Sequence, residues 1–81
     1  MMIPRDLDGV LVSTPDILSG AIRFAGTRVP VQALLDSLRS GETLEQFLDG
    51  YPGVTREQAR AVLLWEDEQT RRAFGIDTRA S

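Results

Sequence analysis

The spacing of apolar residues changes about a third of the way along the chain. Residues 10–12 and 21–24 form two short β-prone runs, separated by turn-forming residues around Pro15 and Gly20. We expect the two runs to pair as a β-hairpin with a long loop. Because an isolated two-stranded hairpin is only marginally stable, this hairpin must lie on helices or pair with a second copy of the chain.

Beyond residue 29 the apolar positions recur every three or four residues, which is the period of a helix with one face on a core. Three helices are expected, over about 30–40, 43–50 and 55–74, the third and longest having roughly 18 residues. The residues that this period directs to the core are Val31, Leu34, Leu35, Leu38, Leu44, Phe47, Leu48, Tyr51, Ala59, Val62 and Leu63.

Local signals mark where each helix begins and ends. Pro30 suits the first helical position, where its missing N–H is tolerated. The Thr and Gln residues at 43–46 and 55–58 have the spacing of capping boxes. Gly41 and Gly75 suit the position just past a helix end.

These elements predict a single, mainly helical domain. A hairpin and its connecting loop occupy 9–29, a three-helix unit 30–75 and a frayed tail 76–81, while residues 1–9 form an irregular lead-in. The second and third helices, joined by a glycine-containing turn at 50–54, match a helix-turn-helix. The length of that turn favours a three-helix, homeodomain-like form.

The composition argues against an enzyme. The 81 residues include no Cys and no His, which excludes disulfides, thiol chemistry and most zinc sites, and removes the side chain most used for proton transfer. The acidic run 66–68 and the pair Glu45 and Asp49 are interpreted as solvated helix faces. We therefore expect no catalytic residue, no metal site and no cofactor.

The longest apolar runs are only a few residues, far short of the roughly 20 that a bilayer requires. Residues 1–8 lack the apolar stretch of a signal peptide. We expect a cytoplasmic protein without a membrane partner.

The charge pattern leaves DNA binding open. The net charge is −3 and every basic residue is Arg, so binding to DNA would need a local cluster. In a helix-turn-helix, the N-terminal residues of the second helix of the motif contact the bases. In this chain that helix is the one expected over 55–74, and the candidate DNA-binding residues are Thr55, Arg56, Gln58 and Arg60. The alternative is an ordinary solvated helix face, with Thr55 and Gln58 used only as a capping pair.

Leu64 and Trp65 fall outside the centre of the core face of the third helix. Trp is common at the centres of protein interfaces, so one interpretation is a dimer or partner surface. The alternative for Trp65 is that it packs under the N-terminal hairpin.

A loop between the second β-prone run and the first helix is hard to explain as a plain connection. Its residues Gly26, Thr27 and Arg28, together with the earlier Gly20, form a motif in which glycine suggests a positive φ. Thr27 could accept an N–H near the helix start, and Arg28 could bind a carboxylate. The loop lacks the glycine spacing and the Lys of a phosphate loop.

The stretch 15–31 resembles the signature of the domain of unknown function family 433. It has that family's glycine-containing turn and apolar strand, followed by Gly-Thr-Arg, an aliphatic residue, Pro and Val. Gly41 and Tyr51-Pro52 match further landmarks, so the resemblance extends over about residues 10 to 70. The chain departs from the pattern at Ser19, where a second glycine is common, and at Ala21, where a basic residue is common.

The resemblance implies a three-helix, homeodomain-like fold and an antitoxin of the VapB type. Such a protein would neutralise a PIN-like ribonuclease toxin and, as a homodimer, would repress its own operator DNA through Thr55, Arg56, Gln58 and Arg60. The alternative from the sequence is a protein–protein interaction module, or a small homo-oligomer, that does not bind DNA.

Overall fold

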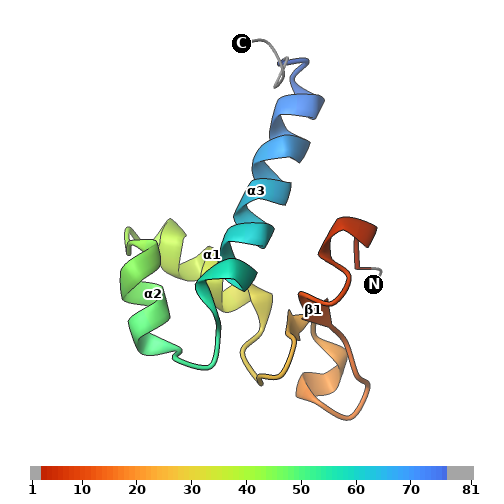
Figure 1. The fold of residues 1–81 in the computed structure, drawn as a ribbon, viewed down its shortest axis with the longest axis vertical. Coiled ribbons are helices and arrows are strands. Elements are labelled where there is room, and N and C mark those ends of the chain that lie inside the picture. Colours follow the sequence, from red (N-terminus) through yellow and green to blue (C-terminus); the bar gives the residue numbers. More distant parts are fainter. Residues whose placement is uncertain (1–2, 77–81) are drawn as a thin grey trace.

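The computed structural model describes residues 3–76 (Figure 1). Within these residues the domain consists of three α-helices, two short 3-10 helices and a two-stranded sheet. In chain order the elements are the 3-10 helix η1 (Arg5–Leu7), β1 (Leu11–Val12), the 3-10 helix η2 (Leu18–Gly20), β2 (Arg23–Phe24), α1 (Val31–Arg39), α2 (Leu44–Gly50) and α3 (Arg56–Ala73). The frayed tail predicted at 76–81 lies, apart from Ile76, outside the described residues.

The predicted hairpin is present, with strands shorter than the sequence runs. β1 and β2 are antiparallel, with Leu11 opposite Phe24 and Val12 opposite Arg23. Beyond the strands, the Ala25 N–H donates to the Val10 carbonyl at 2.9 Å. Leu11 and Phe24 are both buried in the core that the helices share, so the hairpin is stabilised by packing on helices of its own chain.

The start of α1 differs by one residue from the prediction. Pro30 is not the first helical residue, because its ψ of 149° is extended and it forms an isolated antiparallel bridge with Arg23. It therefore prolongs the sheet before the chain turns into the helix. The end of α1 is as predicted: Gly41 has a φ of 99°, and its N–H donates to the Leu38 carbonyl. Together with the bond from Glu42 N–H to the Ser37 carbonyl, this forms a Schellman motif.

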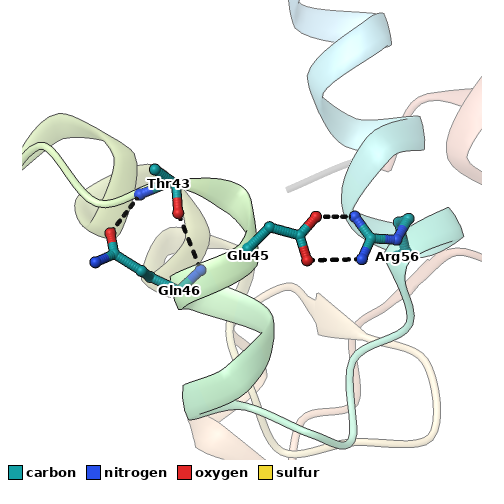
Figure 2. A network of polar contacts seen from close by, with 4 residues as sticks. All are labelled: Thr43, Glu45, Gln46 and Arg56. Atoms are coloured by element: carbon teal, nitrogen blue, oxygen red, sulfur yellow. Dashed lines mark hydrogen bonds and ion pairs between the residues drawn. The ribbon is translucent and has the colours of Figure 1, made fainter.

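Both predicted capping boxes are present. Thr43 Oγ1 accepts the Gln46 N–H at 3.1 Å, and Gln46 Oε1 accepts the Thr43 N–H at 2.8 Å (Figure 2). Thr55 and Gln58 repeat the arrangement at 3.0 and 2.9 Å. Each box satisfies two backbone donors that the first turn of a helix leaves without partners, so the starts of α2 and α3 are fixed locally.

The core is centred on Phe24 and Phe47, whose ring centroids lie 6.4 Å apart. Its buried apolar residues are Leu7, Leu11, Phe24, Leu34, Phe47, Val54, Ala59 and Val62. Most other predicted core residues of the helices are partly buried around this cluster. Tyr51 is an error of the prediction: it is 39% exposed, because it lies at the C-terminal cap of α2 with its ring against Phe47 and its other side to solvent.

The irregular lead-in predicted for residues 1–9 needs correction at residues 5–7; residues 1–2 lie outside the described residues. Residues 5–7 form η1, which contacts α3, and Leu7 is only 3% exposed. The bonds from Leu7 N–H to the Pro4 carbonyl and from Asp8 N–H to the Arg5 carbonyl shape this turn. η1 is therefore part of the domain, and Leu7 belongs to its core.

α3 extends well beyond the rest of the domain (Figure 1). Its first half packs on the core through Ala59 and Val62, whereas no residue of α3 after Trp65 is buried. Half of the longest element is thus exposed on nearly all sides.

Candidate functional site

The loop over residues 25–29, which we call the motif loop, is closed by Thr27. The Thr27 hydroxyl donates to the Phe24 carbonyl at 2.9 Å and accepts the Val29 N–H at 3.0 Å. Phe24 N–H in turn donates to the Val29 carbonyl, and Gly26 has a φ of 76°. The positive φ and the hydroxyl bonds are those of a tight structural turn.

Arg23 is buried in the structure, although the sequence did not identify it as a candidate functional residue. It is only 9% exposed, its Nε donates to the Thr27 carbonyl at 2.9 Å, and its Nη1 donates to Thr14 Oγ1 at 3.3 Å. A buried charge without hydrogen bonds would strongly destabilise the fold. The guanidinium therefore ties β2, the motif loop and the hairpin loop together. The signal in the sequence is a single charge inside the apolar run 21–24.

Gln58 joins the motif loop to the start of α3. While its Oε1 serves the capping box, its Nε2 donates to the Ala25 carbonyl at 3.0 Å. The turn before α3 lies close to the same loop, since a Cβ at Gly53 would stand 3.5 Å from Thr27 Cγ2. Both ends of the Gln58 amide are thus used inside the molecule, so reading a base would require breaking one of these bonds.

Arg56 is held towards α2. It forms a two-pronged ion pair with Glu45, in which Arg56 Nη2 lies 2.7 Å from Glu45 Oε1 and Nη1 bonds to Oε2 (Figure 2). The hydrogen bond from Arg56 holds the pKa of the Glu45 carboxyl below its ordinary value, and the bond to Glu45 raises the pKa of Arg56. Both side chains are about half exposed or more, so the pair is open to solvent and is screened by it.

The four residues predicted to meet DNA are therefore in different states. Thr55 caps α3, Gln58 is engaged and Arg56 is paired. Arg60 is exposed and makes no hydrogen bond or ion pair with any residue of 3–76, and the same holds for Arg28 in the motif loop. At the start of α3, two of the four residues are therefore used in the helix cap, and the positive charge of Arg56 is balanced by Glu45.

Leu64 and Trp65 are adjacent but differ in their surroundings. Leu64 is 61% exposed, whereas Trp65 is partly buried against the core. A hollow of about 270 Å³ lies between η1 and α3, lined by Asp6, Leu7, Ala61, Leu64, Trp65 and Glu68. Trp65 therefore packs on the core and lines the hollow beside η1, whereas Leu64 remains at the surface.

Two further exposed apolar residues lie at the distal end of α3. Phe74, the C-terminal cap, is 76% exposed, and Ile76 just beyond it is 50% exposed. They were not selected from the sequence, although both are apolar residues beside the predicted helix stop at Gly75. They make the end of α3 an apolar tip.

Within residues 3–76 no group of three or more carboxylates is placed to hold a metal ion. In the same range, no helix combines the length and the apolar character that a membrane crossing requires.

The fold and its surfaces define a small, mainly helical domain with a β-hairpin fastened to a protruding third helix. The family profile described as "Protein of unknown function (DUF433)" matches residues 11–65, and the chain belongs to this family. The match spans β1 to Trp65 and so includes the motif loop and both capping boxes.

One relative and one solved structure are similar to this chain. The chain is 33% identical over 70 residues to "Uncharacterized protein y4eO" from Sinorhizobium fredii (strain NBRC 101917 / NGR234), an alignment that covers 82% of this chain and 32% of the relative. The chain thus spans about a third of the relative's length. The crystal structure of a DUF433 member protein from Anabaena variabilis ATCC 29413 matches with a TM-score of 0.65 and 23% identity, covering 86% of this chain and 80% of that chain. This likeness shows the shared fold.

Proposed function

We propose that the protein is a cytoplasmic, antitoxin-like binding protein that neutralises a PIN-like ribonuclease toxin by holding it on the distal part of α3. The observation that carries the proposal is the apolar tip of this helix. Phe74 and Ile76, just past the end of α3, are 76% and 50% exposed. The helix that carries them extends past the domain core (Figure 1). Large apolar side chains gathered on a protruding element favour a protein interface.

The charge of the chain supports a partner of this kind. A ribonuclease must hold a polyanion, so its surface carries positive charge. The chain has a net charge of −3. On α3, Glu66 lies between the core and the tip, beside Asp67 and Glu68, which are paired with Arg71 and Arg72 at the surface. Attraction between the acidic chain and the basic surface of the ribonuclease would speed their association. The bound chain would then compete with RNA for that basic surface.

The test is co-expression with the protein encoded by the adjacent gene, with growth and co-purification scored together. We expect that the neighbour alone stops growth, and that this chain restores growth and co-elutes with the neighbour. If the protein encoded by the adjacent gene does not stop growth and does not co-elute with this chain, the antitoxin function is wrong.

A matched pair of variants tests the assigned surface. Phe74→Ser should weaken co-elution and rescue, because an anchor in the interface is lost. Leu18→Ser removes another exposed apolar residue, 38% exposed and outside α3, and should change neither. If the two variants behave alike, the tip of α3 is not the binding surface.

Operator binding through a homeodomain-like helix-turn-helix is the second candidate function. The observation in its favour is that Arg60 and Arg28 are exposed and unpaired among the described residues, and that the Arg56 pair is solvent-exposed and open to exchange with phosphate. Arg56→Ala combined with Arg60→Ala should abolish a shift of the upstream DNA in a gel. Unchanged binding would show that these arginines of α3 do not hold the DNA.

A further inference from the structure

One side of α3 carries charged and apolar residues in a regular order. The five residues are Glu57, Arg60, Leu64, Glu68 and Arg71. They are three or four positions apart, so they lie on the same side of the helix. Four are exposed and Arg71 is partly exposed, and we call this stripe the Leu64 face.

The Leu64 face lies between two neighbouring elements and is covered by neither. On one flank Arg56 is turned towards α2 by its pair with Glu45. On the other flank, Ala61 and Trp65 line the hollow next to η1. Leu64, in the middle, is 61% exposed.

The order of charges on this face is complementary to itself when the helix is reversed. From the N-terminus the five positions read acidic, basic, apolar, acidic and basic. Arg60 and Glu68 each lie four residues from Leu64, and Glu57 and Arg71 each lie seven residues from it. An antiparallel copy centred on Leu64 would therefore bring Arg60 to Glu68 and Glu57 to Arg71, whereas a parallel copy would bring each charge to its own kind.

We propose that the Leu64 face binds a second copy of this chain, with the two α3 helices antiparallel about a two-fold axis at Leu64. In such an interface each contact occurs twice, so both charge combinations are formed on either side of the axis. Leu64 is near the middle of Arg56–Ala73, so the helices would overlap along their whole length. The hollow beside each Leu64 offers room for the Leu64 side chain of the other copy. The proposal does not depend on a toxin.

Contacts within the chain are compatible with this pairing. Arg71 Nε lies 2.9 Å from Asp67 Oδ2, and Arg72 Nη2 lies 2.9 Å from Glu68 Oε1. Both pairs are exposed and contribute little by themselves. They hold Arg71 and Glu68 in place, and an interchain pair can share these groups. Arg60 would then serve a protein contact, which is an alternative to its contact with DNA.

Charge exchange between two variants tests the pairing. Arg60→Glu and Glu68→Arg should each weaken self-association about tenfold or more, because each reversal places like charges together twice. Mixed in equal amounts they should form a heterodimer, since the glutamate introduced at position 60 of one variant then meets the arginine introduced at position 68 of the other. Sedimentation measures all three samples, and circular dichroism checks that each variant is folded.

Arg39→Glu, which reverses an exposed charge on α1, is the control and should associate like the unaltered chain. A monomeric unaltered chain would overturn the proposal. So would normal association of Arg60→Glu, or failure of the mixture to recover association.

Cross-linking locates the two-fold axis independently. The chain has no Cys, so Leu64→Cys provides a single thiol that faces its copy in the proposed dimer. Mild oxidation should join two chains of this variant at low protein concentration. Asp49→Cys, at an exposed position of α2, should not form a cross-linked dimer. Equal cross-linking at both positions would overturn the proposal.

Discussion

The Gln58 side-chain amide donates to the Ala25 carbonyl at 3.0 Å, and this bond joins two segments that lie 33 residues apart in sequence. The same amide accepts the Thr55 N–H. One side chain thus fixes both the start of α3 and the position of the motif loop. Gln58, which a DNA-binding interpretation would use to read bases, therefore stabilises the fold by joining two segments.

Gln58→Ala should lower the free energy of unfolding more than Gln46→Ala. Both changes remove the glutamine of a capping box, but only Gln58 also bonds to another segment. We expect a loss of about 1 kcal/mol for Gln46→Ala and about 2 kcal/mol for Gln58→Ala. Urea unfolding of the two variants measures the difference, and equal losses would mean that the bond to Ala25 adds no stability.

Arg23→Met should destabilise the fold by about 2 to 4 kcal/mol, since it removes bonds to the Thr27 carbonyl and the Thr14 hydroxyl. Arg23→Lys should recover only part of the loss, because one ammonium cannot reproduce the fork of a guanidinium. Arg39→Met, at an exposed position, is the control and should stay within about 0.5 kcal/mol. Urea unfolding compares the three variants, and an equally small effect at Arg23 would contradict its assigned role.

Leu7→Ala should lower the free energy of unfolding by about 2 to 4 kcal/mol, because Leu7 is 3% exposed in the shared core. Asp6→Ala, one residue earlier and exposed, should have little effect. Thermal unfolding followed by circular dichroism checks both. A neutral Leu7→Ala would mean that the N-terminal segment is not needed for the core.

The pair of Glu45 and Arg56 should stabilise the fold near neutral pH and not in acid. The folded-state pKa of Glu45 is lowered, so its contribution is present above the ordinary value of 4.5 and is lost as the pH falls through the lower folded-state value. Glu45→Gln should therefore be slightly less stable than the unaltered chain near neutral pH and equal to it in strong acid. Unfolding by urea across this pH range measures the difference, and a difference that stays constant with pH would contradict the role of the pair.

The helix limits could be predicted because their causes are local. Thr43, Thr55, Gly41 and Gly75 act within four residues of themselves, and all four take the predicted positions. Pro30 lay one residue off because a bridge to Arg23 competes with the helix. The bridge joins residues of two different segments, and the spacing of apolar residues within a helix gives no information about such a contact.

Leu7, Val54 and Arg23 were not identified as buried for the same reason. Leu7 and Val54 lie outside any apolar period, in a short turn and a loop, and their burial depends on the elements that fold over them. Arg23 resembles the polar half of an alternating strand until the motif loop closes on it. The choice between a packed and an exposed Trp65 likewise depended on η1, which was not predicted from the sequence.

The protruding half of α3 has a consequence for hydrogen exchange and for affinity. In a single copy of the chain, amide protons around Val62, which is buried, should exchange slowly, whereas those near Arg72 should exchange quickly, because the last turns gain no support from the core. Pairing of two copies along α3 would slow exchange in these last turns. A partner that settles on Phe74 must first hold these turns in helical form. Part of its binding enthalpy would then offset lost conformational entropy, so the affinity should weaken on warming.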